Sequence, residues 1–197
     1  MTILKKDIIA EEALNLFLRL GTQVVSMDDI ANRCGMSKRT LYKEFDSKTD
    51  LLHYTYRKEL DRFNKGISCI QNNSESALEE LLNFSILLGN VFSTISPIVV
   101  NDLRKYYNNI YLDILDFKSK VISPFLRKNI NNGIKENLYR NSLPIEEFED
   151  SFTTILGFIL KNSYTNNTTS KYNRLLEFAF YLFISGLQSS ADFKKQT

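Results

Sequence analysis

The stretch SMDDIANRCGMSKRTLYKEFDSK, which begins at Ser26, constrains the fold of this chain more than any other. Its pattern predicts two short helices joined by a tight turn. Ser26 is followed three residues later by Asp29, which is the spacing of a capping box at a helix start. Gly35 supplies the backbone freedom that a sharp turn requires, and Ser37 is suited to cap the second helix. We therefore expect a helix-turn-helix over about residues 26–45.

The second of these helices, expected over about residues 37–45, has one apolar and one polar face. Leu41 and Phe45 lie four residues apart and should face inward. A short helix that is basic on its outer side and held by a fixed turn suits the major groove of DNA. The whole chain has a formal charge of only +2, so affinity for DNA must come from this local patch. The outward residues are Lys38, Arg39, Thr40, Tyr42 and Lys43.

The rest of the chain predicts an all-α fold of about nine helices, because its 197 residues include only 7 glycines and 3 prolines. A first helix is expected over about residues 5–20, and a fourth, linking helix over about residues 48–70. The polar run QNNSES at 71–76 is the predicted domain boundary. It separates a DNA-binding head, residues 2–70, from a regulatory and dimerisation body, residues 74–197.

The body is expected to consist of helices, one of which is unusually apolar. Residues 178–184 read FAFYLFI, which is apolar all round a helix and predicts burial on several sides. A membrane span needs about twenty apolar residues, so we expect a subunit interface there instead. The body helices are expected at about 76–94, 97–106, 109–137 with a kink or break at Pro124, 145–164 and 172–189, with a polar loop at 166–170.

The N-terminal quarter also carries many residues at the fixed spacing of one known family. They are Ala13, Leu16-Phe17, Gly21, Ile30-Ala31, Gly35-Met36-Ser37, Thr40-Leu41-Tyr42, Phe45, Ser47-Lys48 and Leu51-Leu52. Through them, the segment from about residue 5 to residue 52 resembles the N-terminal domain of the TetR family of bacterial transcriptional regulators. The resemblance implies a three-helix DNA-binding head and a helical body that dimerises by pairing its last two helices into a four-helix bundle. It also implies a ligand cavity among the middle helices.

The family pattern implies a set of DNA-contacting positions on the second helix of the motif and at the start of the next helix. Lys38 and Arg39 are expected to reach base edges or nearby phosphates. Thr40, Tyr42 and Lys48 match positions that would contact phosphates and set the register. The complete predicted set is Ser37, Lys38, Arg39, Thr40, Tyr42, Lys43 and Lys48.

Two positions in this region have a less defined role. Lys43 could contact either a base or a phosphate. Glu44 departs from the aromatic residue or histidine that is often found there in TetR-like proteins. A carboxylate beside the DNA backbone weakens a phosphate contact, although it could accept a hydrogen bond from a cytosine amine.

Catalytic and metal-binding patterns are missing from the sequence. The single histidine, His53, excludes His-based triads and multi-histidine metal sites. Cys34 and Cys69 match no metal or redox spacing, and no glycine-rich phosphate loop is present. We therefore predict a cytoplasmic protein with no enzymatic activity, no cofactor, no metal and no membrane association.

These observations predict a homodimeric, sequence-specific transcriptional regulator that binds a double-stranded DNA operator. We expect a repressor that a small apolar or amphipathic ligand releases, bound in a mostly apolar pocket among the aromatic residues of the middle helices. Two alternatives stay open. The body could bind a protein partner instead of a ligand, or it could be an enzyme-like domain, which would require convergent carboxylates with shifted pKa values.

Overall fold

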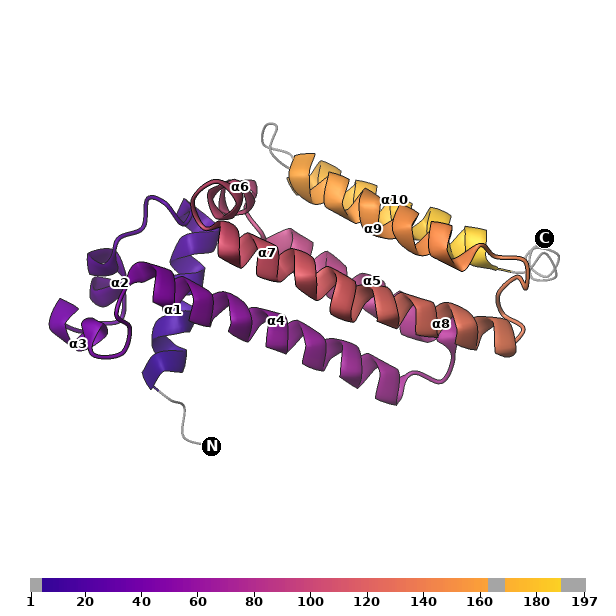
Figure 1. The fold of residues 1–197 in the computed structure, drawn as a ribbon, viewed down its shortest axis with the longest axis horizontal. Coiled ribbons are helices and arrows are strands. Elements are labelled where there is room, and N and C mark those ends of the chain that lie inside the picture. The colour runs from indigo at the N-terminus through magenta and orange to yellow at the C-terminus, as the bar shows by residue number, and fades with distance from the viewer. Residues whose placement is uncertain (1–4, 163–168, 189–197) are drawn as a thin grey trace. The chain divides into compact units, whose positions relative to one another are not determined.

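The structure describes residues 5–162 and 169–188, in which helices joined by turns and short loops form the fold. The computed structural model is drawn in Figure 1, and the predicted all-α class is confirmed. The described residues also contain one isolated antiparallel β-bridge, between Tyr139 and Gln188. The elements are α1 (Lys5–Leu20), α2 (Met27–Arg33), α3 (Lys38–Tyr42), α4 (Lys48–Asn73), α5 (Ala77–Thr94), α6 (Pro97–Tyr106), α7 (Asn108–Phe117), the π-helical turn η1 (Lys118–Ile122), α8 (Ser123–Lys135), α9 (Ile145–Asn162) and α10 (Thr169–Leu187).

The first half of the helix-turn-helix follows the sequence prediction. At the start of α2, the backbone N–H of Asp29 donates to Ser26 Oγ at 3.1 Å, and the Ser26 N–H donates to the Asp29 carboxylate at 2.8 Å. This reciprocal pair is the predicted capping box. The Ser26 hydroxyl also donates to the Asp29 carboxylate at 2.6 Å, and this bond, followed by the bond from the Ser26 N–H, lowers the pKa of Asp29. After α2, Gly35 has a φ of 63°, a left-handed conformation that glycine adopts without steric cost.

Helix α3, the second helix of the helix-turn-helix and called the recognition helix below, is shorter than the sequence predicts. It begins after Ser37, whose Oγ accepts a hydrogen bond from the Thr40 N–H at 3.2 Å. It ends at Tyr42, whereas the apolar pattern suggested Phe45. The Phe45 N–H still donates to the Leu41 carbonyl, but the chain turns there toward α4. Phe45 is buried in the core of the head, so its apolar character reflects packing in a turn rather than a further helical residue.

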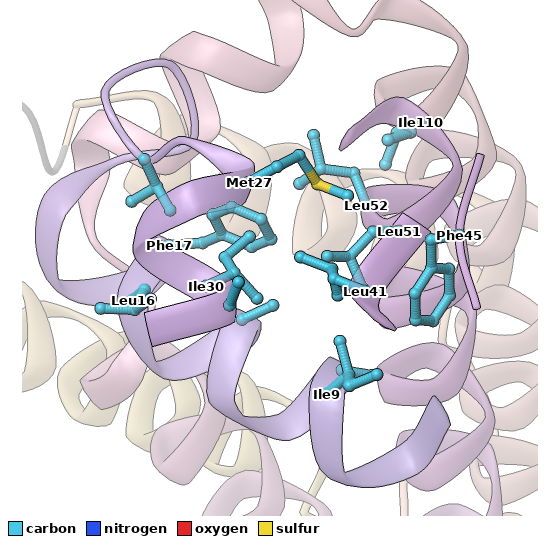
Figure 2. Packing of buried hydrophobic residues seen from close by; sticks show 14 of the residues in the cluster. Ile9, Leu16, Phe17, Met27, Ile30, Leu41, Phe45, Leu51, Leu52 and Ile110 are labelled. Atoms are coloured by element: carbon cyan, nitrogen blue, oxygen red, sulfur yellow. The ribbon is translucent and has the colours of Figure 1, made fainter. Parts of the chain in front are cut away.

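Figure 2 shows how the core of the head is assembled around the helix-turn-helix. Ile9 and Phe17 from α1 face Ile30 from α2, and each of the three is fully buried. Leu41 from α3 and Leu51 from α4 complete the centre of the cluster. Each buried side chain of this size contributes about 1.5–3 kcal/mol relative to exposure, so several helices hold α3 in place.

Three residues from beyond the predicted head also belong to this core: Val99 and Leu103 on α6, and Ile110 on α7. The compact unit accordingly contains the described residues up to Arg62 together with Thr94–Ile114. The second compact unit contains Phe63–Ser93 and the described residues from Leu115 onward. These packing units differ from the boundary at 71–76 that the polar run suggested, because α6 and part of α7 pack with the head. The division into residues 2–70 and 74–197 stays a prediction about function.

The second unit has a core of aromatic rings. Phe84 on α5 lies 4.5 Å from Phe125 on α8, between ring centroids, and 6.3 Å from Phe180 on α10. Phe152 on α9 lies 5.1 Å from Phe180. Edge-to-face and tilted arrangements of this kind are favourable for aromatic pairs. The rings therefore connect four helices of this unit.

The break predicted near Pro124 is present. The π-helical turn η1 directly precedes α8, and Pro124 occupies the first turn of α8. Proline has no N–H to donate to the carbonyl four residues earlier, so the α-helical ladder cannot continue regularly through this point. The stretch expected at 109–137 is consequently two helices, α7 and α8. The predicted loop at 166–170 lies outside the described residues up to 168, and its last two residues already belong to α10, which begins at Thr169 rather than at the predicted residue 172. The predicted helix ends at Tyr164 and Ser189 lie outside the described residues.

A buried polar network joins the start of α5 to α8. The Asn129 amide donates to the Ala77 carbonyl at 2.7 Å and accepts from the Tyr139 hydroxyl at 3.2 Å. Glu80 is also buried, and within the described chain its Oε1 has no hydrogen-bond partner. Burial raises the pKa of Glu80, while hydrogen bonds from Gln71 and Asn129 oppose the shift. The carboxyl group is therefore less acidic in the folded chain than in the unfolded one.

We expect Glu80→Gln to stabilise the fold at neutral pH. A raised carboxyl pKa means that stability is fully present below the ordinary glutamate pKa and is lost as the pH rises through the folded value. Glutamine stays neutral, so the variant should gain on the order of 1 kcal/mol at pH 7, and the gain should vanish toward pH 4. Urea unfolding between pH 4 and pH 8 measures this difference. The exposed Glu177, replaced by glutamine, is the control; an equal gain there would contradict the explanation.

No single described helix is both long enough and apolar enough to span a membrane. The bent pair Ala77–Thr94 and Ile98–Tyr106 meets the criteria of length and composition only when the two helices are taken together.

Candidate nucleic-acid interface

The predicted DNA-contacting residues lie on the short α3 helix, next to it, and at the start of α4. Thr40 and Lys48 are half-buried, and the other five are exposed. α3 presents its polar side because Leu41, on the opposite side, is anchored in the core of the head. The short helix therefore holds several cationic or hydroxyl side chains at the surface of a rigid unit. The exposed members are Ser37, Lys38, Arg39, Tyr42 and Lys43.

Arg39 and Lys43 are two cations of this surface that can bind a phosphate without first breaking an ion pair. Both are exposed, and within the described residues neither takes part in an ion pair. They lie four residues apart, so they project from the same side of the recognition segment. A guanidinium and an ammonium in this position can both bind phosphate oxygens, and the guanidinium can also bind a guanine edge in a bidentate manner.

Ser37 and Thr40 have a structural role in addition to any contact with DNA. Their hydroxyl oxygens are 2.8 Å apart, and Ser37 Oγ also accepts the Thr40 N–H. This pairing caps the first turn of α3. One of the two O–H groups is donated in this mutual hydrogen bond, so the other can still donate to a phosphate oxygen without loss of the cap.

Lys38 is held in an intramolecular ion pair. Its Nζ lies 2.9 Å from both carboxylate oxygens of Asp28, in the first turn of α2. The hydrogen bond and then the charge of Asp28 raise the pKa of the Lys38 ammonium. The sequence prediction named Lys38 but did not identify this carboxylate. The two residues are ten positions apart, and only the turn between α2 and α3 brings them together.

Lys48 is anchored at the start of α4. Its Nζ donates to the backbone carbonyl of Gln23 at 3.1 Å. Partial burial lowers the pKa of the Lys48 ammonium, and the negative charges of Asp102 and Asp29 oppose this shift. The ammonium has three N–H groups, so one hydrogen bond to a carbonyl leaves donors for a phosphate.

Asp102 on α6 fixes the loop that leads from α1 to α2. Its Oδ2 accepts the Gln23 N–H at 2.9 Å and the Thr22 hydroxyl at 3.2 Å. Gly21, at the end of α1, has a φ of 91°, and a β-carbon added there would meet the Ile98 side chain at 2.7 Å. α6 therefore contacts the backbone of this loop closely. Sequence reasoning missed Asp102, because its partners are about eighty positions away and no local pattern marks them.

Glu44, which departs from the family pattern, is partly neutralised within the head. Its carboxylate lies 3.6 Å from the Lys5 Nζ on α1. The Glu44 side chain is 24% exposed. Its charge is therefore moderated near the recognition helix, and Lys5 is occupied by this contact.

The described part of the chain contains no candidate metal site. No three side chains of His, Cys, Asp or Glu gather there in a way that could hold a metal ion.

Comparison with known proteins shows which proteins this chain is similar to. Residues 9–55 match the model of the family described as bacterial regulatory proteins, tetR family. An HTH-type transcriptional regulator of Staphylococcus aureus (strain USA300) is 32% identical over 116 residues, which are 55% of this chain and 62% of the relative. A regulator of the strain COL matches with the same identity and coverage. The match thus spans about 62% of the length of these relatives.

Solved structures share the fold across nearly the whole chain. A transcriptional regulator from Cytophaga hutchinsonii has a TM-score of 0.75 at 20% identity, over 94% of this chain and 99% of that one. The fatty acid degradation regulator FadR from Bacillus halodurans has a TM-score of 0.73 at 17% identity, over 95% and 98%. The ketosteroid transcriptional regulator KstR2 of Mycobacterium tuberculosis has a TM-score of 0.66 at 16% identity, over 96% and 98%.

Proposed function

We infer the function of this chain from its family: it belongs to the TetR family of bacterial regulatory proteins, and we propose that it binds DNA sequence-specifically to regulate transcription. The observation that carries the proposal is that Arg39 and Lys43 are exposed and form no ion pair with any described residue, on and directly after a helix whose other side is fixed in the core. In this proposal Arg39 and Lys38 reach base edges or nearby phosphates. Thr40, Tyr42 and Lys48 bind phosphates and set the register, and Lys43 binds either group.

We propose that the functional unit is a homodimer formed through α9 and α10, which run side by side in Figure 1. These two helices share an open apolar groove of about 480 Å³. An exposed apolar groove of this kind is typical of an interaction surface. The lining residues are Phe148, Ile155, Phe158, Leu175, Phe178, Ala179, Leu182 and Phe183. A second copy would place two recognition helices on one duplex, where about 34–36 Å separates successive major grooves.

The finer part of the proposal is that the protein is a repressor and that a small apolar or amphipathic molecule releases it from DNA. The aromatic interior of the second unit, with Phe84, Phe125, Phe152 and Phe180 in ring contact, is chemically suited to such a ligand. Two structures of the same fold are named as a fatty acid degradation regulator and a ketosteroid transcriptional regulator, which agrees with this ligand class. Coupling between ligand and DNA of about 1–3 kcal/mol would weaken binding roughly 5- to 150-fold.

Control by a protein partner is the second candidate. An apolar groove favours a protein contact, but a second copy of the chain already accounts for the groove on α9 and α10. The groove therefore gives the alternative no separate support. A long-chain fatty acid or a steroid, added to the DNA complex, separates the two cases, because only the ligand proposal expects release.

Selection of bound duplexes from a random-sequence pool tests the proposed function. The purified full chain should enrich an inverted repeat whose half-sites lie about one helical turn, or a multiple of it, apart. Enrichment should weaken steeply between 50 mM and 200 mM salt, as expected for a protein that neutralises phosphates. A pool that shows no enriched sequence at either salt concentration would contradict sequence-specific DNA binding.

A further inference from the structure

The cations of the head differ in how they are paired, and this difference bears on DNA binding. Four of them form ion pairs outside the recognition helix: Lys5 with Glu44, Arg33 with Glu12, Lys58 with Asp7, and Arg62 with Glu59. Among the seven predicted DNA contacts, Lys38 is the one that an ion pair occupies within the described chain. Arg39, its neighbour in sequence, has no such partner.

The Lys38 ammonium lies close to both oxygens of the Asp28 carboxylate. Its Nζ is 2.9 Å from both Oδ1 and Oδ2 of Asp28. Each side chain is 56% exposed, so the pair lies at the surface of the head, where a duplex could approach. Asp28 takes no part in the capping box of α2, which uses Ser26 and Asp29. The carboxylate therefore has Lys38 as its evident partner.

This pairing changes what Lys38 can offer to DNA. A lysine whose charge is already matched by a carboxylate neutralises no additional phosphate charge unless the pair opens. If Lys38 turns to a phosphate, the exposed ion pair is lost, and the Asp28 carboxylate is left beside a polyanion. Both effects oppose binding to any duplex, whatever its sequence.

We propose that Asp28 limits the DNA affinity of this chain by offsetting the charge of the Lys38 ammonium, so that Lys38 contributes its full charge to a phosphate contact only when the ion pair opens. The proposal rests on the proposed function, because it presupposes that α3 faces DNA. Asp28 weakens sequence-independent binding to DNA, whereas Arg39 and Lys43 can contact DNA without breaking an ion pair. This weaker binding reduces the occupancy of the many competing duplexes that carry no operator.

The test uses Asp28→Asn, which removes the negative charge and nearly preserves the shape of the side chain. Binding of the full chain to a 30-base-pair duplex of arbitrary sequence is measured by fluorescence anisotropy between 50 mM and 200 mM salt. The variant should bind about two- to fivefold more tightly for each head that engages, the range for the loss of an exposed ion pair. The slope of log affinity against log salt should steepen by about 0.9 per released lysine.

A matched control separates this effect from a general gain of positive charge. Lys120 and Asp116 form a similar surface pair at 2.8 Å in the second unit, and Asp116 is 54% exposed. Asp116→Asn makes the same change in net charge and should leave duplex binding unchanged. Equal affinities of the Asp28→Asn and Asp116→Asn variants, or weaker binding by Asp28→Asn, would overturn the proposal.

A double variant shows whether Asp28 acts through Lys38. In a Lys38→Ala background, Asp28→Asn should still relieve the repulsion between the carboxylate and DNA, but it should leave the slope of log affinity against log salt unchanged, because no ammonium remains to be released. The same steepening of the slope in both backgrounds would mean that Asp28 does not act through Lys38, which also overturns the proposal. If the wild-type chain fails to bind this duplex at 50 mM salt and also enriches no sequence from a random pool, the proposed function falls together with this inference; failure on this duplex alone overturns only the inference. If the wild type binds and Asp28→Asn matches its control, only the inference falls.

Discussion

Replacing both Arg39 and Lys43 by alanine is expected to weaken binding to the selected operator by at least about 100-fold and to leave the fold intact. A good contact between a side chain and a base edge contributes about 1–3 kcal/mol, and a dimer would lose both residues twice. The slope of log affinity against log salt should also become shallower, by about 0.9 for each phosphate contact removed. Fluorescence anisotropy on the operator duplex at several salt concentrations measures both quantities.

The control for this pair removes two positive charges elsewhere. Lys65 on α4 and Lys135 at the end of α8 are exposed and belong to the second compact unit. Their double alanine variant has the same net charge and should keep operator affinity within a few-fold of the wild type. Circular dichroism and thermal unfolding should be unchanged for Arg39 and Lys43, since both side chains lie outside the core. Unaltered operator affinity in a folded Arg39→Ala, Lys43→Ala variant would remove these residues from the interface.

Local patterns in the sequence were sufficient to predict the parts of the site that short-range chemistry determines. The capping box of Ser26 and Asp29 depends on residues three apart, and Ser37 caps α3 through its near neighbour Thr40. The interruption near Pro124 follows from the missing N–H of proline. In each case the interacting groups lie within one helical turn, so their spacing in the sequence already contains the geometry.

Contacts between distant segments could not be predicted in this way. The pairing of Lys38 with Asp28 depends on the angle of the turn at Gly35, and the pairing of Asp102 with Thr22 depends on where α6 packs. The same packing makes Val99 and Leu103 part of the core of the head, although the polar run at 71–76 suggested a boundary well before them. Apolar periodicity indicates that a helix has a buried face, but it does not identify the partner of that face.

Replacing Phe178 by glutamate is expected to convert the proposed dimer into monomers at micromolar concentration. Phe178 is 56% exposed in the isolated chain and lines the groove on α9 and α10. In a two-fold interface every substitution acts twice. Losing the burial of two phenylalanine side chains removes about 3–6 kcal/mol, and placing two carboxylates in an apolar contact adds a further cost. A dissociation constant at least about 1,000-fold higher should result, which sedimentation velocity over a range of concentrations measures.

Ile86 on α5 provides the matched control, because it is equally prominent but lies outside the groove. It is 61% exposed, and Ile86→Glu introduces the same charge into the same compact unit. That variant should remain dimeric. Operator binding connects the interface to function: the Phe178→Glu monomer should bind a single half-site with nearly normal contacts but lose the gain from joining two heads, which is commonly 100- to 10,000-fold. If Phe178→Glu stays dimeric while Ile86→Glu dissociates, the pairing surface includes α5 rather than the α9 and α10 groove. If both variants stay dimeric, the second copy binds elsewhere, and the groove again becomes available to another protein.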